Sequence, residues 1–263
     1  MTTLSYAVAD SATMLRRNLK RMQRYPAMTV MIIMVPVVLL LLFVYVFGGT
    51  LGAGLGHLGD GRAAYLSYVT PGIVLLTLGT AATSTAVSVA MDMSSGIIAR
   101  FRTMAIARVS VLTGHVLGSM ILSLLGIAFV IGIAVAMGFR TSADPLSWLA
   151  VAGLLVMITF AITWLAVALG LVSGSAETAS NLPMFLMLLP FLGSGFVPVA
   201  SMPLALRWFA DYQPFSPVIT TLRGLLIGGP IGHNATLAIA WGVAIAVASY
   251  LWARRLYNRD PVG

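Results

Sequence analysis

Long apolar runs separated by short polar segments dominate the chain. Most of these runs reach the roughly 20 residues that an α-helix needs to cross the hydrocarbon core of a bilayer. The pattern predicts an all-α integral membrane fold with six spans, at Met28–Phe47, Leu66–Met91, Val111–Phe139, Trp148–Val172, Leu182–Val197 and Ala235–Trp252.

Two regions depart from this simple pattern. Residues 1–26 place apolar side chains at three- and four-residue steps and basic side chains on the other face, which is typical of a helix lying in the headgroup plane. Prolines interrupt residues 182–229, and proline removes a backbone donor and breaks helices. Within residues 198–229 we expect an external re-entrant hairpin between the fifth and sixth spans, built from short helices at Leu204–Asp211 and Phe215–Ile227.

The basic residues predict the orientation, because cytoplasmic loops carry an excess of Lys and Arg. With six spans and both termini in the cytoplasm, most of them fall on the inner side: Arg16, Arg17, Lys20, Arg21, Arg24, Arg100, Arg102, Arg108, Arg254, Arg255 and Arg259. The outer segments then hold Arg62, Arg140, Arg207 and Arg223. The loop at 173–181 has no basic residue. It is placed inside only because four predicted spans precede it.

Composition identifies lipid as the main solvent. The chain is 59% hydrophobic and 8% charged, whereas a soluble domain is about 25% charged. Its net charge of +8 could suggest nucleic acid, but the basic residues cluster at span ends. That placement indicates anionic lipid headgroups as partners, and no nucleic acid. The absence of cysteine excludes disulfides, thiol nucleophiles and Cys-ligated metals.

The chain lacks the residues that would supply its own energy. Its only lysine, Lys20, lies outside any G-x-x-x-x-G-K-[ST] sequence, so no Walker A loop can form. All carboxylates fall in loops or at span ends, whereas ion-driven transporters usually carry ionisable groups within their spans. We therefore expect no cofactor in this chain, and energy from another chain.

No catalytic or metal site is predicted. His57, His115 and His233 lack metal-ligand spacing and are interpreted as interfacial or packing residues. The G-x-G-x-x-G sequence at residues 54–59 follows a predicted span instead of a strand, so we interpret it as an external loop.

The polar segment at residues 92–110 is too long for a tight connection between the second and third spans. Read as a helix from Gly96 on, it gathers apolar side chains, Phe101 among them, on one side, while Arg100 and Arg102 project elsewhere. Such a helix could lie on lipid, and it could equally dock into a groove of a partner protein.

This segment resembles the cytoplasmic loop of ABC-2 type permeases, notably the daunorubicin-resistance type. The matching positions are Asp92, Gly96, Arg100, Phe101, Arg102, Arg108 and Gly114, with Ala105 at the place of the family's frequent proline. The outer region is similar to the same family at Gly195, Phe196, Pro198, Pro203, Pro214, Phe215, Arg223 and Gly224. Residues 16–19 and 45–49 also match the family, but more weakly. The resemblance therefore covers nearly the whole chain.

The resemblance implies a single ABC-2 transmembrane domain over residues 1–263, in the cytoplasmic membrane of a bacterium. It implies two copies of a separate ABC ATPase, which bind ATP and Mg, and a second permease copy or a related permease chain. The segment Gly96–Arg102 would be a coupling helix seated in the ATPase, and Glu177 would make a second, smaller contact. This implication favours partner docking over lipid contact for that segment.

The same resemblance implies an ATP-driven exporter. The predicted path carries few charges, which suits a hydrophobic or amphipathic compound, such as a drug-like metabolite or a lipid. A polysaccharide or glycolipid exporter of the same superfamily is the nearer alternative, and it would be expected to line its path with more aromatic and polar groups. A membrane-embedded lipid-modifying enzyme would need a clustered acid, histidine or metal site, which the sequence does not offer.

Overall fold

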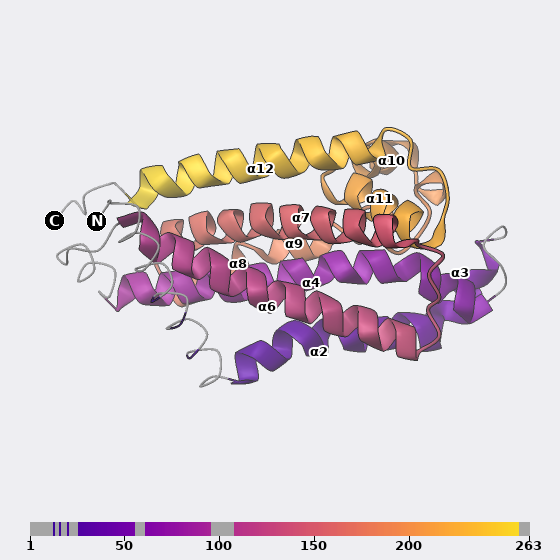
Figure 1. Cartoon of the computed structure of the whole chain (residues 1–263), viewed down its shortest axis with the longest axis horizontal. Helices are drawn as coiled ribbons and strands as arrows, with labels where there is room; N and C mark the ends of the chain where they lie inside the picture. Colours follow the sequence, from indigo (N-terminus) through magenta and orange to yellow (C-terminus); the bar gives the residue numbers. More distant parts are fainter. Residues whose placement is uncertain are drawn as a thin grey trace.

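The chain forms an elongated bundle of helices (Figure 1). The structure, a computed structural model, describes residues 13, 16, 20, 26–55, 61–95 and 108–257, and these contain no strand. The helices are α2 (Pro26–Leu42), the π-helix η1 (Phe43–Phe47), α3 (Gly48–Ala53), α4 (Gly61–Ser94), α6 (Arg108–Ala136), α7 (Pro145–Val172), α8 (Ala176–Asn181), α9 (Met184–Leu188), the short 3-10 helix η3 (Val199–Ser201), α10 (Leu204–Tyr212), α11 (Phe215–Ile227) and α12 (Asn234–Tyr257).

Five helical stretches in the described residues are long and apolar enough to cross a membrane, which confirms the all-α membrane fold. They are Val30–Ala53, which joins α2, η1 and α3, together with α4, Leu112–Ala136 of α6, α7 and α12. The helices extend beyond the predicted runs. The Gly-rich residues 48–53, which follow the predicted first span, continue it as α3.

Helix α4 lies at the centre of the bundle. Its most apolar window is 72% buried, whereas the corresponding windows of α2 and α12 are 28% and 17% buried. Small residues let neighbouring segments approach α4 closely: Gly170 of α7 packs against Ala86, and Met187 of α9 packs against Gly79. The exposed apolar faces of the outer helices suit contact with lipid or with another membrane chain.

The predicted fifth span is broken. Within residues 182–197 the structure has only the short helix α9, followed by turns, and this segment is not among the five candidate spans. Pro183 and Pro190 flank α9 and explain the interruption, since each lacks the N–H that would continue a helix. The prediction of a sixth helical span is therefore not confirmed.

Helix α8 and the broken segment together nevertheless run antiparallel to α4 over much of its length. Ala179 of α8 packs in one cluster with Ala90 of α4, and Gly195 of the broken segment lies against Gly72 of the same helix. At about 1.5 Å per residue, the stretch of α4 between these two contacts rises about 27 Å. That distance is close to the roughly 30 Å thickness of a hydrocarbon core.

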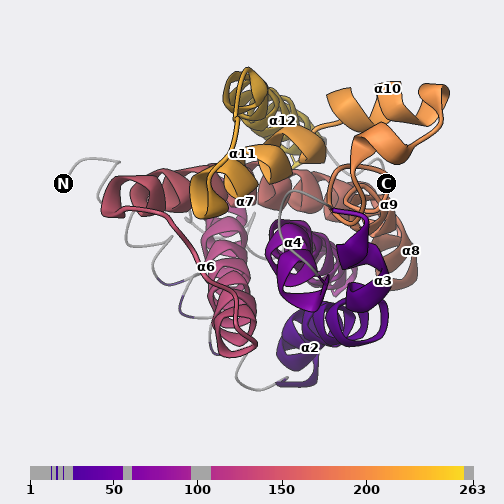
Figure 2. The same ribbon diagram turned by 90° about the vertical axis from the view of Figure 1, so that its right-hand side faces the viewer.

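The two short helices predicted for the outer region are present as α10 and α11. With α3 they occupy one end of the bundle, which Figure 2 shows end-on. Their predicted return toward the membrane stays a prediction. Most of the expected interfacial helix at residues 1–26 lies outside the described residues, although Thr13, Arg16 and Lys20 are helical and exposed.

Asp144 begins α7 as its N-cap, and its Oδ1 accepts a hydrogen bond from the Ser147 N–H at 2.9 Å. Hydrogen bonds from the Ser147 side chain and backbone hold the pKa of Asp144 below its ordinary value of 3.8. We expect Asp144→Ala to lower the unfolding temperature in detergent slightly, and Asp144→Asn to preserve it, because asparagine also caps helices.

The carboxylate's contribution to stability is present above its ordinary pKa and is lost as the pH falls through the lowered folded-state pKa. The unfolding temperatures of Asp144→Ala and the unmodified protein should therefore converge at acid pH below 3.8. An unchanging difference across the whole pH range would contradict this account of the cap.

Candidate functional site

A buried pair joins the two helices that flank the predicted coupling loop. Asp92 lies in the last turn of α4 and His115 in the second turn of α6. His115 Nε2 and Asp92 Oδ2 are 3.1 Å apart, and each side chain is 5% exposed. Because both side chains are buried, water does not compete for this hydrogen bond. The bond therefore holds the ends of α4 and α6 together.

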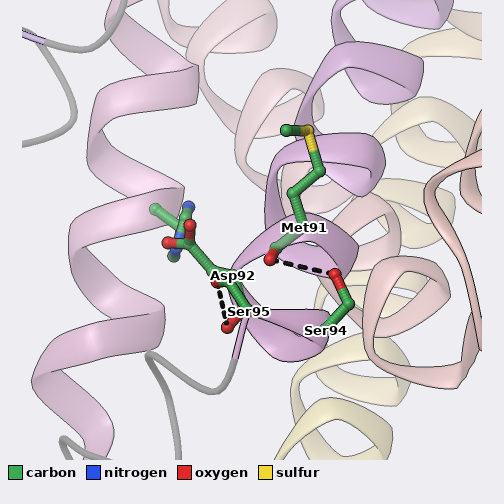
Figure 3. Close-up of polar contacts among 5 residues, drawn as sticks. Met91, Asp92, Ser94 and Ser95 are labelled. Atoms are coloured by element: carbon green, nitrogen blue, oxygen red, sulfur yellow. Dashed lines mark hydrogen bonds and ion pairs between the residues drawn. The ribbon is translucent and has the colours of Figure 1, made fainter.

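The end of α4 is closed by its own serines. Ser94 Oγ donates to the carbonyl of Met91 at 3.1 Å, and Ser95 Oγ donates to the carbonyl of Asp92 at 3.3 Å (Figure 3). The Met91 carbonyl also accepts from the Ser95 N–H at 3.0 Å, so the two serines supply additional partners to carbonyls at the end of the helix. They fix the backbone from which the Asp92 side chain projects toward α6.

Four spans meet beside this pair in one apolar cluster. Val89 of α4, Val116 of α6, Trp164 of α7 and Tyr257 of α12 are all buried within it. The Trp164 and Tyr250 rings pack edge to face, with centroids 5.0 Å apart. Since packed side chains transmit displacements between rigid helices, a shift of the Asp92–His115 pair would be felt by α7 and α12.

The remaining residues of the predicted coupling site are only partly described. Gly96, Arg100, Phe101 and Arg102 lie outside the described residues, and Arg108 begins α6. Glu177 is exposed in the first turn of α8, where Ser175 Oγ accepts a hydrogen bond from the Thr178 N–H at 3.1 Å. Helix α8 lies toward the same end of the bundle as the last turn of α4 (Figure 1).

At the opposite end, Arg223 joins three segments. Its guanidinium carbon lies 3.7 Å from the centroid of the Tyr68 ring. Nη2 donates to the Tyr68 carbonyl at 3.1 Å and to the Ser194 carbonyl at 2.7 Å. Arg223 therefore links α11 to α4 and to the turn that follows α9.

Polar side chains in α11 and just before it form hydrogen bonds with the backbone of the turn that follows α9. Gln213 Nε2 donates to the Leu189 carbonyl at 3.2 Å and to Ser216 Oγ at 2.9 Å. Ser216 Oγ also accepts from the Ser194 N–H at 3.1 Å. Irregular backbone survives at membrane depth only where such partners are available.

Two backbones touch where the broken segment crosses the start of α4. A Cβ atom added to Gly72 would lie 2.6 Å from the carbonyl oxygen of Gly195. A Cβ atom added to Gly195 would lie 2.5 Å from the carbonyl oxygen of Pro190. Only glycine fits at either position.

Aromatic rings cover this crossing. Phe196 stacks on Phe191 with ring centroids 4.1 Å apart, and Phe43 of η1 packs on Phe196 at 4.6 Å. The Tyr65 hydroxyl donates to the Phe196 carbonyl at 3.1 Å. The π-helix thus lies where the first span meets the broken segment.

The predicted outer residues fall into three groups, and Arg223 belongs to two of them. Gly195, Phe196, Phe215 and Arg223 meet at the junction of α4, α11 and the turn after α9, and Pro198, Arg223 and Gly224 line one cavity of about 460 Å³. The remaining two predicted residues mark helix starts, since Pro203 precedes α10 and Pro214 precedes α11.

A second hollow, of about 390 Å³, lies between α2, α4 and α9. Its lining is almost wholly apolar and includes Met31, Val35 and Met187. Both of its threonine hydroxyls bond within the protein, since Thr80 Oγ1 donates to the Thr77 carbonyl at 2.8 Å and Thr83 Oγ1 donates to the Gly79 carbonyl at 3.2 Å. Such a surface favours apolar ligands over hydrated ones.

Three features were missed by the sequence reasoning: His115 as the partner of Asp92, Tyr68 as the partner of Arg223, and the Gln213 network. Asp92 and His115 are 23 positions apart on different helices, and no periodic pattern in the sequence indicates that they pair. Among the described residues, no group of His, Asp or Glu is arranged to hold a metal ion.

The family model described as ABC-2 type transporter matches residues 11–227. The chain is 27% identical over 257 residues to the daunorubicin resistance ABC transporter permease protein DrrB1 of Streptomyces coeruleorubidus, covering 97% of this chain and 88% of that protein. It is 26% identical over 181 residues to the probable doxorubicin resistance ABC transporter permease protein DrrC of Mycobacterium tuberculosis, covering 66% of this chain and 64% of that protein. The resemblance seen in the sequence is confirmed.

Proposed function

Since this chain belongs to the ABC-2 type transporter family, we propose that it is the permease of an ATP-driven exporter in the cytoplasmic membrane of a bacterium. The proposed cargo is a hydrophobic or amphipathic compound, such as a drug-like metabolite or a lipid. The observation that carries this proposal is the similarity, over 97% of the chain, to a permease named for daunorubicin resistance.

The proposed transporter contains two permeases and two copies of a separate ABC ATPase. The chain's only lysine, Lys20, stands in the sequence Leu-Lys-Arg and cannot complete a Walker A loop. ATP and Mg are therefore assigned to the partner subunit, and this chain is assigned no enzymatic step.

The proposed topology has six crossings and both termini in the cytoplasm. Five crossings are the candidate spans, and the sixth is the broken segment at residues 182–197. Together with α8, it runs along about 27 Å of α4, which supports this assignment because that rise approaches the thickness of a bilayer core. Helices α10 and α11 then form the external re-entrant region.

The proposed coupling element is the loop between α4 and α6, with Glu177 as a second contact. Closure of the ATPase on ATP would displace this loop. The Asp92–His115 hydrogen bond at its base, and the four-helix cluster beside it, would carry the displacement into the spans. The apolar hollow between α2, α4 and α9 supports the assignment of a hydrophobic cargo.

The function can be tested in cells that express the permease with the ABC ATPase encoded beside it. Doxorubicin fluorescence reports its accumulation. We expect lower accumulation only when both subunits are present, and loss of the effect when the catalytic residues of the ATPase are replaced. Reduced accumulation with the permease alone would overturn the proposal.

The coupling assignment has a separate test in Arg100→Glu. A reversed charge at a docking helix places like charges together, which costs several kcal/mol. We expect at least about tenfold weaker copurification of the ATPase and a matching loss of substrate-stimulated hydrolysis. Arg140→Glu, a reversal at the other end of the bundle, is the matched control. Equal ATPase binding by both variants would remove the assignment.

A further inference from the structure

Arg223 is a cation without a described counter-ion. It is half-buried, and no carboxylate among the described residues pairs with it. Its Nε and Nη2 donate to backbone carbonyls, whereas Nη1 donates to no described residue. Withdrawing a guanidinium from water without a negative partner is costly, so the site is suited to recruiting an anion.

The cation opens onto a cavity. About 460 Å³ of space is lined by Arg223 and Tyr68, by the hydroxyl-bearing Thr220, and by apolar residues that include Leu55 and Ile227. This volume lies within the roughly 300–1,000 Å³ of typical small-molecule sites. One cationic group within mostly apolar walls matches a ligand with a single anionic head and an apolar body.

The depth of the cavity indicates where that ligand resides. Helix α4 has 34 residues, so at about 1.5 Å per residue it is about 51 Å long. This exceeds a hydrocarbon core of roughly 30 Å by about 10 Å at each end when the helix is centred. Tyr68 stands about 10 Å from the start of α4, at the level where lipid headgroups meet the hydrocarbon.

We propose that this cavity binds the phosphate of an anionic phospholipid through Arg223. Guanidinium groups bind phosphate oxygens through charge-assisted hydrogen bonds, and stacking on Tyr68 holds the group in place. The lipid's glycerol and acyl chains lie along the apolar wall. The proposal does not depend on the transported compound or on an ATPase partner.

The test leaves Arg223 intact, because it also holds the Tyr68 and Ser194 carbonyls. Ile227 follows it by one helical turn and lines the same cavity, so Ile227→Glu places a carboxylate beside the guanidinium. Ile227→Gln has the same size without the charge. Leu204→Glu adds the same charge at an exposed position on α10. Thermal unfolding and gel filtration confirm that each variant is folded.

Retention of phosphatidylglycerol and of diacylglycerol, which lacks the phosphate, is measured by native mass spectrometry. The unmodified chain, Ile227→Gln and Leu204→Glu should prefer phosphatidylglycerol by about tenfold or more, the scale of one charge-assisted hydrogen bond, and Ile227→Glu should show no preference. Equal preference in Ile227→Glu and Ile227→Gln would overturn the proposal.

A second arm compares sodium phosphate with sodium chloride at equal ionic strength, without added lipid. Phosphate alone should raise the unfolding temperature little. A different result is a rise for the unmodified chain as large as the rise with phosphatidylglycerol, together with no rise for Ile227→Glu. In that case the site binds phosphate, but the lipid is wrong as its source and a free anion is the ligand.

Discussion

Replacing Gly72 with alanine is expected to cause a large loss of stability for a change of one methyl group. The new Cβ would meet the backbone of Gly195 at 2.6 to 3.0 Å, and neither backbone can swing aside as a side chain would. Overpacking typically costs about 1–3 kcal/mol, so we expect the unfolding temperature in detergent to fall by at least about 5 °C. Gly195→Ala should behave similarly, because its Cβ would meet the Pro190 carbonyl.

The matched control is Gly132→Ala, in the exposed part of α6, where a Cβ would have no neighbour within 4 Å. Alanine favours helix over glycine, so this variant should be as stable as the unmodified protein. Scanning fluorimetry on tryptophan emission follows all three variants. If Gly72→Ala and Gly132→Ala unfolded at the same temperature, the close contact between α4 and the broken segment would be wrong.

The second large effect is expected at Asp92. Asp92→Ala removes the acceptor that His115 Nε2 faces at 3.1 Å, and leaving a buried polar group without its partner costs about 1–3 kcal/mol. Asp92→Asn retains an oxygen in the same place and should lose less. Unfolding temperature reports stability, and substrate-stimulated hydrolysis by the ATPase partner reports coupling.

A double-mutant cycle separates the pair from other effects of each residue. If the two side chains act together, Asp92→Ala with His115→Ala should cost less than the sum of the single changes, by about 0.5–3 kcal/mol. Additive losses would show that the two residues stabilise the protein independently. They would also remove the pair as a link between the coupling loop and the spans.

The membrane fold was predictable because apolar runs depend only on local sequence. A long apolar run without proline breaks becomes helical in lipid, because its backbone groups find their partners within the helix. The ends of the spans were less predictable. Residues 48–53 have little hydrophobic character, yet they continue the first helix, where Gly52 packs against Gly61 at the start of α4.

The candidate sites were predictable in place but not in their contacts. Asp92 was identified as part of the loop, whereas its pairing with His115 depends on the register of two antiparallel helices. Arg223 was assigned to the outer region by its charge and by the family resemblance. Charge counting carries no information on the Tyr68 ring and the two carbonyls that surround it.

The polar network around residues 189–194 has a consequence for biosynthesis. The Leu189 carbonyl accepts from Gln213 and the Ser194 N–H donates to Ser216, and both partners are translated about twenty residues later. Until those side chains leave the ribosome, the proline-broken stretch would expose unpaired amides to lipid, at a cost of several kcal/mol for each group. In the proposed topology of six crossings, the entry of this stretch into the bilayer must therefore wait for α11, so these two elements insert as one unit.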